Sequence, residues 1–331
     1  SLCLILTINI GNYYLSEREK NVFIYISLFF LIIMFLILYP KLVKILLDGE
    51  ISFYGYFLYE DPLFFNKESP RATGTSRSIL FIIIFIDIIC VSTKFKYKKI
   101  ISSLIRTFGF YNIYLFQSRT VIFLMLIYIL FILIFQNEKT FKNFFKNIFL
   151  YIMIPLTLVY FTFSASLLIH QNKENIITKG DTFFEKLYNH NQQNFVKLPT
   201  RKVKEGNFSS GRYNDWVELY NKLNKSPFIG HGSQADRYLI NQSASNGLLY
   251  SASSSGILGS IFFIIFSFLI FLKVFKNLID KKLEFKFKII SMGILCILGR
   301  SVLESSYAVF SVDLILLCTM ITLLDFKKIN E

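Results

Sequence analysis

The 331-residue sequence is short of charged residues and of the residues that build disulfide or metal frameworks. Only 18% of its residues are charged, whereas an average soluble domain carries about 25%. It contains four cysteines and three histidines. The cysteines all lie in apolar stretches, and the histidines are too scattered to form a metal site. These shortages exclude a soluble enzyme and a disulfide scaffold, and we expect no bound metal.

Long apolar runs are what the sequence has in excess, with 53% of its residues hydrophobic. A helix that crosses a bilayer needs about 20 mainly apolar residues. Eight runs approach that length with their flanks: residues 22–39, 79–91, 100–116, 121–135, 148–169, 257–272, 287–298 and 307–324. Residues 2–10 look like half of a ninth span and follow no initiator methionine, so we expect a truncated N-terminus. The sequence predicts an all-α polytopic integral membrane protein of eight or nine transmembrane helices.

Lysines predict the orientation of these spans. They gather in every second connection, at residues 94–99, 139–146 and 273–288, and again in the tail at 327–328. Cytoplasmic loops of membrane proteins carry such an excess of Lys and Arg. Topology therefore explains the formal net charge of +14, and we expect no nucleic-acid partner.

The orientation divides the chain into three regions. Residues 1–169 form N-terminal transmembrane helices, residues 170–246 a large external loop, and residues 247–331 C-terminal transmembrane helices with a cytoplasmic tail. Loops as long as the external one are commonly functional. Within it, residues 212–225 carry apolar side chains at helical spacing. This helix either lies along the membrane with Trp216 at headgroup level, or packs inside a small external domain.

Arginines stand at or near the external ends of the spans. They are Arg71, Arg119, Arg212 and Arg300, with Arg77 as a further candidate. The planar guanidinium group suits phosphate oxygens, which it binds through two parallel hydrogen bonds. Several arginines on the same side as a basic loop therefore favour an anion-binding site.

Other charged and small residues suggest specific local contacts. Glu304 follows Arg300 by four positions, a spacing that predicts either a local ion pair on a helix or a carboxylate held beside a phosphate-binding arginine. Asp87 and Arg106 fall inside spans, where charged residues pair with one another. We expect these two to form an ion pair within the bundle. The serine run at 251–255 either unwinds or lines a wet cavity.

Six short stretches on the external side carry a family resemblance. They are RATGTS at 71–76, QSRT at 117–120, SGRYNDW at 210–216, SPFIGHG at 226–232, SNGLLYSASSSGILG at 245–259 and GRSVLE at 299–304. Their order, spacing and shared side resemble the bacterial O-antigen polymerase and O-antigen ligase superfamily (Wzy and WaaL, Wzy_C type).

The resemblance implies a C-type membrane glycosyltransferase of the bacterial inner membrane, with its active site facing the periplasm or exterior. Such enzymes need no metal ion and no cofactor. The donor is a glycan on undecaprenyl diphosphate, and an acceptor hydroxyl displaces the lipid diphosphate. The implied partners are the lipid-linked oligosaccharide and membrane lipids, together with a chain-length regulator and a flippase.

The resemblance also implies roles for particular residues. Catalysis is assigned to Arg212, Arg300, His231 and Glu304, with His231 as the available general base. Contacts with the diphosphate or glycan are assigned to Arg71, Arg119, Arg212, Arg300, Trp216, Gly230, Gly232 and Asn246.

One departure from the family pattern separates the alternatives. Ligases carry His-Asn where this chain has Ser245 and Asn246. The missing histidine disfavours an O-antigen ligase and leaves a polymerase of lipid-linked repeat units as the leading interpretation. A non-enzymatic transporter or flippase of lipid-linked sugars is the third alternative, although the sequence shows no internal repeat of the kind that many transporters contain.

Overall fold

The computed structural model describes residues 17–47, 72–94, 96–116, 118–135, 141–162, 164–165, 212–223, 226–241, 243–309 and 311–324. Helices and the turns between them make up these residues, which contain no strand. The predicted all-α class is therefore confirmed for the described part of the chain.

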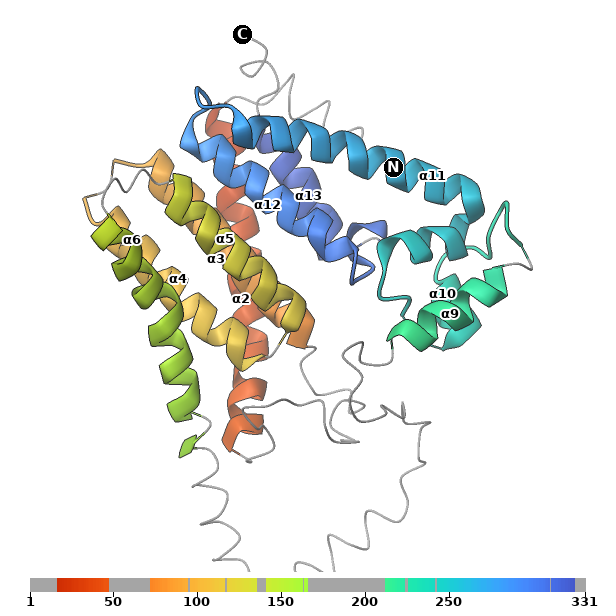
Figure 1. The fold of residues 1–331 in the computed structure, drawn as a ribbon, viewed down its shortest axis with the longest axis horizontal. Coiled ribbons are helices and arrows are strands. Elements are labelled where there is room, and N and C mark those ends of the chain that lie inside the picture. The colour runs from red at the N-terminus through yellow and green to blue at the C-terminus, as the bar shows by residue number, and fades with distance from the viewer. Residues whose placement is uncertain are drawn as a thin grey trace, which may run out of the picture.

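The helices follow the apolar runs of the sequence, although the expected run 307–324 begins in a 3₁₀ turn and a bend before its helix starts at Val312. Figure 1 shows their arrangement. The elements are α2 (Glu17–Leu47), α3 (Ala72–Ser92), α4 (Lys98–Leu115), α5 (Arg119–Phe135), α6 (Phe141–Ile148), the π-helical η3 (Phe149–Met153), α9 (Arg212–Leu223), α10 (Ala235–Ile240), α11 (Gly247–Ile279), α12 (Phe285–Ser301), the 3₁₀ turn η4 (Ser306–Ala308) and α13 (Val312–Leu323).

Three described helices are long and apolar enough to cross a membrane, which indicates a membrane protein. They are Gly74–Ser92, Phe144–Thr162 and Gly247–Ile279. Shorter apolar helices accompany them at Asn21–Ile37, Arg119–Phe135 and Val312–Leu323. The count of eight or nine spans stays a prediction.

Helices α3 and α11 occupy opposite environments. In α3, 67% of the apolar window is buried, whereas in α11 only 6% is buried. Helix α3 packs against α2, α4 and α12, so its apolar side chains form the centre of the bundle. Helix α11 runs along the upper edge in Figure 1 and turns its apolar residues outward. An apolar helix surface that no protein covers is typical of a helix that faces lipid.

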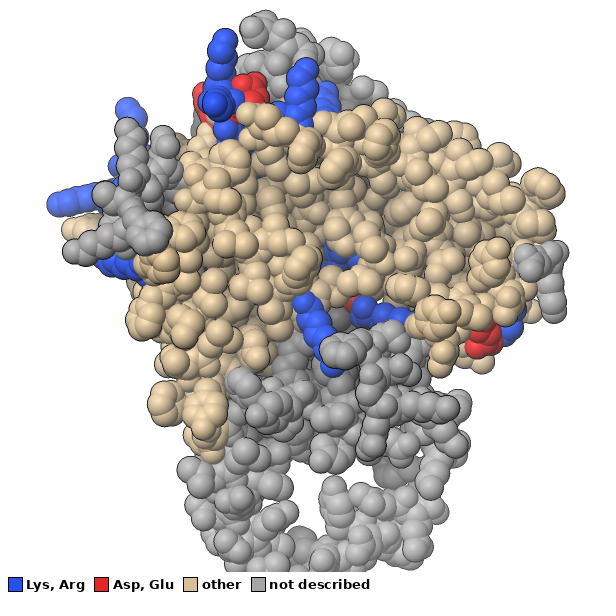
Figure 2. All heavy atoms as spheres, viewed as in Figure 1, with Lys and Arg blue, Asp and Glu red and all other residues tan. Residues whose placement is uncertain are grey.

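Lysine-bearing helix ends lie together. The end of α5, the start of α6 and the turn that joins α11 to α12 all lie at the upper left of Figure 1. Figure 2 shows Lys and Arg side chains concentrated around this end and along the top. The arrangement matches what the alternation of lysine-rich connections predicts for one side of a membrane.

A buried ionic network joins α3, α4 and α5 toward the lysine-bearing end. Arg106 makes two hydrogen bonds to Asp87, from Nε to Oδ2 at 2.9 Å and from Nη2 to Oδ1 at 3.1 Å. Ser102 and Tyr128 donate their hydroxyls to the same carboxylate at 2.5 and 2.6 Å. The predicted Asp87–Arg106 ion pair is therefore confirmed, and its carboxylate is fully satisfied by donors.

A short π-helical segment completes this network. Such widened turns occur as single-turn insertions in α-helices. In η3, Tyr151 is buried, and its ring faces the Arg106 guanidinium with 5.6 Å between the guanidinium carbon and the ring centroid. The Thr107 hydroxyl donates to the Leu150 carbonyl at 3.3 Å. The π-turn thus connects the candidate span Phe144–Thr162 to the charged centre of the bundle.

Helix α11 is interrupted at Gly256, where φ is 65° and ψ is −159°. The interruption leaves backbone groups without helical partners, and the turn at 226–232 supplies them. The amides of His231 and Gly232 donate to the carbonyls of Ser253 and Ser254 at 2.8 and 3.0 Å. The Ile257 amide donates to the Pro227 carbonyl at 2.8 Å. The serine run itself stays helical, so the reading that it unwinds is wrong. The break falls at Gly256, directly after the run, and its free backbone groups are satisfied by protein.

We predict that Gly256→Ala detaches this turn from α11. Its φ lies in the left-handed region, and an added Cβ would lie 2.3 Å from the Phe228 carbonyl oxygen. Thermal unfolding followed by the emission of Trp216, the single tryptophan, should show a large loss of stability. Gly232→Ala is the matched control, because Gly232 has φ of 88° but no atom within 4 Å of the added Cβ. Its loss should be limited to backbone strain of about 1–2 kcal/mol. Equal losses in both variants would contradict the close contact.

We also predict that Asp87→Leu strongly destabilises the bundle, because Arg106 is left as a buried, uncompensated charge. Removing one partner of such a pair costs about 3–5 kcal/mol. The double variant Asp87→Leu with Arg106→Met should recover most of that loss, since apolar replacements of a buried pair are often neutral. Unfolding by a denaturing detergent, followed by circular dichroism, measures both effects. A double variant no more stable than the single one would show that the pair does not act as a unit.

Candidate functional site

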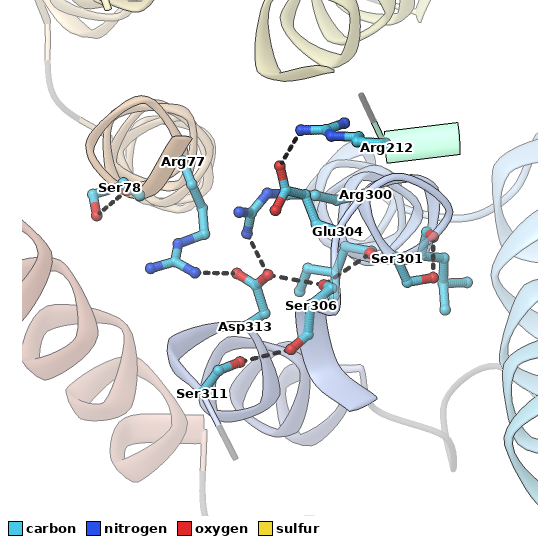
Figure 3. A network of polar contacts seen from close by, with 12 residues as sticks. Arg77, Ser78, Arg212, Arg300, Ser301, Glu304, Ser306, Ser311 and Asp313 are labelled. Carbon is cyan, nitrogen blue, oxygen red and sulfur yellow. Dashed lines mark hydrogen bonds and ion pairs between the residues drawn. The ribbon is translucent and has the colours of Figure 1, made fainter. Parts of the chain in front are cut away.

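The candidate site lies at the helix ends opposite the lysines. The described chain brings together the start of α3, the end of α12, the start of α13 and the start of α9 (Figure 3). Arg77 lies near the start of α3, Arg300 at the end of α12, and Asp313 at the start of α13. Helix α9 contributes its first residue, Arg212. Charged residues far apart in the sequence thus converge at one end of the bundle.

Asp313 is the centre of this site and is fully buried. Its Oδ1 lies 3.1 Å from Nη1 of Arg77, and its Oδ2 accepts a hydrogen bond from Nη1 of Arg300. The Ser306 hydroxyl donates to the same Oδ2 at 2.8 Å. One carboxylate therefore holds two guanidinium groups that come from two different helices.

A second ion pair lies beside the first. Nη2 of Arg212 donates to Oε1 of Glu304 at 3.1 Å, and their side chains are 24% and 18% exposed. We name Arg77, Arg212, Arg300, Glu304 and Asp313 the arginine cluster. Its Arg212–Glu304 pair is the more accessible part, whereas Arg300 and Asp313 are buried behind it.

The local ion pair expected between Arg300 and Glu304 is wrong. Helix α12 ends at Ser301, so Glu304 lies in the following turn and no longer shares a helix face with Arg300. Arg300 contacts Asp313 instead, and Glu304 binds Arg212 of α9. The other reading of the same spacing, a carboxylate held beside a phosphate-binding arginine, stays a prediction.

The arginine cluster carries an excess of positive charge. Its three arginines face two carboxylates, so the sum is one positive charge. Among the residues that the structure describes, the buried Nε atoms of Arg77 and Arg300 find no hydrogen-bond partner. A buried donor without a partner is costly, and an anion with several oxygens is the ligand that would satisfy both donors. The site is chemically suited to a phosphate or diphosphate group.

The turn between α12 and α13 is held from both sides, which positions Ser306 and Asp313. Ser306 has φ of 36°, an unusual backbone for a residue other than glycine. The Ser311 hydroxyl donates to the Ser306 carbonyl at 2.8 Å. On the other side, Tyr307 stacks on Phe263 of α11, and its hydroxyl lies 2.5 Å from that of Ser267. These contacts preorganise the oxygen atoms that face the arginines.

Helices α9 and α10 pack with the start of α11 into a small unit beside the helix bundle, which we call the external unit because it lies outside that bundle. Its apolar centre is formed by four buried residues: Leu219, Ile240, Ala244 and Tyr250. Trp216 donates from Nε1 to the Ala244 carbonyl at 2.8 Å. Of the two alternatives for this helix, the structure favours packing within an external unit. Trp216 anchors α9, and with it Arg212, instead of projecting toward lipid.

Asn246 has its side-chain amide engaged in structural bonds. Its Oδ1 caps α11 by accepting from the amides of Leu248 and Leu249 at 2.9 and 3.0 Å. Its Nδ2 donates to the Val302 carbonyl at 2.9 Å. Asn246 therefore links the external unit to the turn that carries Glu304, a positioning task distinct from the substrate contact that the resemblance implies.

The other predicted site residues lie around the cluster or outside the described chain. Arg71 lies outside the described residues. Arg119 opens α5 at the same end of the bundle as the cluster and is exposed. Gly230, His231 and Gly232 form the turn on the break of α11, and a Cβ at Gly230 would lie 2.5 Å from the Gly256 nitrogen. In the described chain, no hydrogen bond or ion pair joins His231 to the arginine cluster, and its Nε2 is buried without a partner.

Sequence reasoning missed Asp313, the residue on which the cluster is built. The sequence did contain a signal for it. An acidic residue inside the apolar run 307–324 is as unusual as Asp87 and Arg106 are inside their own apolar runs. Ser306 carried no comparable signal, since its role depends on a turn that only the fold defines. As to metals, the described ranges contain no group of three His, Cys, Asp or Glu residues able to hold one.

Comparison with known proteins gives no family assignment. No family model matches the chain, and no curated protein matches it.

We predict that Asp313→Asn lowers the free energy of unfolding by about 3–5 kcal/mol, because it leaves two buried guanidinium groups without their shared counter-charge. Thermal unfolding in detergent micelles measures the loss. Glu218→Gln is the matched control. It removes the carboxylate of the exposed Glu218–Lys222 pair, in which the side chains are 54% and 36% exposed, and such pairs contribute about 0–1 kcal/mol. A midpoint unchanged by Asp313→Asn would remove Asp313 from the centre of the site.

Proposed function

We propose that this membrane protein is a glycosyltransferase that polymerises undecaprenyl-diphosphate-linked oligosaccharide repeat units of a surface polysaccharide. One observation supports this most directly. Arg212 of the external unit lies in one cluster with Arg77 and Arg300 of the bundle, at the end opposite the lysines. A diphosphate at the membrane surface, with its glycan outside, fits a site built from both regions.

The proposed reaction gives each part of the cluster a task. The oxygen of an acceptor sugar hydroxyl attacks the anomeric carbon of the donor glycan, and the bond from that carbon to the diphosphate oxygen breaks. Undecaprenyl diphosphate leaves with the electron pair, and a base takes the hydroxyl proton. Negative charge grows on the leaving group, so preorganised guanidinium groups bind the transition state better than the ground state. His231 is the proposed base, and Glu304 orients Arg212.

Ser245 supports a polymerase over the alternative of an O-antigen ligase. It stands where ligases carry histidine, and its hydroxyl lies 3.4 Å from the Ser243 carbonyl. A serine hydroxyl there is not a general base at neutral pH. The ligase alternative therefore lacks the residue that its chemistry needs at this position.

The broken helix α11 bears on the transporter alternative. In transporters, unwound backbone groups of broken helices coordinate substrates or ions. Here the carbonyls of Ser253 and Ser254 and the amide of Ile257 are bound by the turn at 226–232. Because these groups have protein partners, the break favours a structural joint, and the enzyme remains the better proposal.

The deciding experiment supplies the purified protein in lipid vesicles with a defined undecaprenyl-diphosphate-linked repeat unit. Formation of longer lipid-linked products supports a polymerase. Transfer only to an added lipid A-core acceptor would support a ligase. Movement of the intact substrate across the vesicle membrane without new products would support a transporter.

We predict that Arg212→Ala and Arg300→Ala each reduce polymerisation about 100-fold or more, the usual effect of removing a donor that stabilises transition-state charge. Lysine at either position should restore little, because the guanidinium fork is lost. Product ladders on gels give the rates, and membrane content is measured in parallel. Arg237→Ala is the matched control, since Arg237 is an exposed arginine of the same external unit. Full activity in both cluster variants would overturn the site assignment.

A further inference from the structure

The outward face of α11 beyond Gly256 is a lipid-facing surface. Its first two turns expose Ile257, Leu258, Ile261 and Phe262 by 48%, 58%, 46% and 70%. Figure 2 shows the surface along the upper right, where α11 runs, without charged side chains. A helix this apolar and this little covered by protein needs the hydrocarbon of a bilayer around it.

Two large apolar side chains sit at the tip of the turn attached to this helix. Phe228 and Ile229 are 69% and 80% exposed. The turn is closed by the Ser226 hydroxyl, which donates to the Gly230 carbonyl at 2.9 Å. The Pro227 carbonyl accepts from the Ile257 amide, so the tip is bonded to the first residue of the lipid-facing segment. The exposed pair is therefore rigidly held and continuous with the lipid-facing surface.

The length of the apolar segment of α11 agrees with a tip at the boundary of a membrane. From Ile257 to Leu272 the helix rises about 24 Å, which is less than the roughly 30 Å thickness of the hydrocarbon core. Lys273 follows and marks the opposite, cytoplasmic end of the apolar segment. With that lysine at its interface, Ile257 lies near the external edge of the hydrocarbon, and Phe228 and Ile229 lie beside it.

We propose that the turn at 226–230 is a membrane anchor, in which Phe228 and Ile229 insert among the lipids at the external boundary of the bilayer that α11 crosses. Isolated apolar side chains on a surface need no explanation, but a rigid apolar tip continuous with a lipid-facing helix fits a lipid partner. The anchor holds the external unit, and with it Arg212, against the membrane surface. The inference does not depend on the reaction proposed above.

The experiment places a tryptophan at the tip. It then tests whether brominated lipid or iodide dissolved in the water quenches the emission of that tryptophan. Phe228→Trp and Ile229→Trp are reconstituted separately into phosphatidylcholine nanodiscs, and the emission of the parent protein, which comes from Trp216, is subtracted. We expect the added emission to be shifted to the blue, to be mostly lost when the lipid is brominated near the headgroup end of its acyl chains, and to survive iodide. Circular dichroism checks the fold of each variant, and either variant alone suffices for the test.

Two references define the limits of the measurement. Leu258→Trp, on the lipid-facing surface of α11, reports emission that lipid quenches, and N-acetyltryptophanamide reports emission in water. Tip variants that follow Leu258→Trp support the anchor. Tip variants quenched by iodide and untouched by brominated lipid would overturn it, and the turn would then be an exposed loop in water.

Discussion

The bond between one buried carboxylate and two arginines is the interaction on which the candidate site depends. Asp313 holds Arg77 and Arg300 from different helices, in surroundings where a lone charge is unfavourable. The carboxylate stabilises the guanidinium groups without neutralising the cluster. An excess positive charge remains, and within the described part of the chain the Nε atoms of Arg77 and Arg300 lack hydrogen-bond partners. The described cluster thus keeps one net positive charge at one end of the bundle.

The external unit is also joined to the bundle by polar groups that need partners. Breaking α11 at Gly256 frees backbone groups that must find partners away from water. The turn at 226–232 provides them, and Asn246 and the Arg212–Glu304 pair add two further links. The external unit is consequently attached to the bundle through several contacts, and Arg212 takes a defined position beside the bundle arginines.

Two charge pairs show what could and could not be predicted. Asp87 and Arg106 were foreseen as partners because both lie inside apolar runs, where each charge needs the other. For Arg300 and Glu304, a local ion pair on one helix face was one of two readings of their spacing, and it is wrong because α12 ends at Ser301. Spacing rules hold only while the helix continues, and the end of a helix is a weak signal in sequence.

From the sequence alone, hydropathy predicted the helical class and the positions of the apolar helices. Lysine placement predicted that a lysine-bearing end of the bundle is separate from an arginine-bearing end. These properties are local, since they depend on which residues stand next to one another along the chain. Only the tertiary structure decided that Asp313 binds Arg77 and Arg300, that Glu304 binds Arg212, and that the turn at 226–232 closes the break in α11. Those choices depend on distances between elements far apart in sequence, which packing of the helices determines.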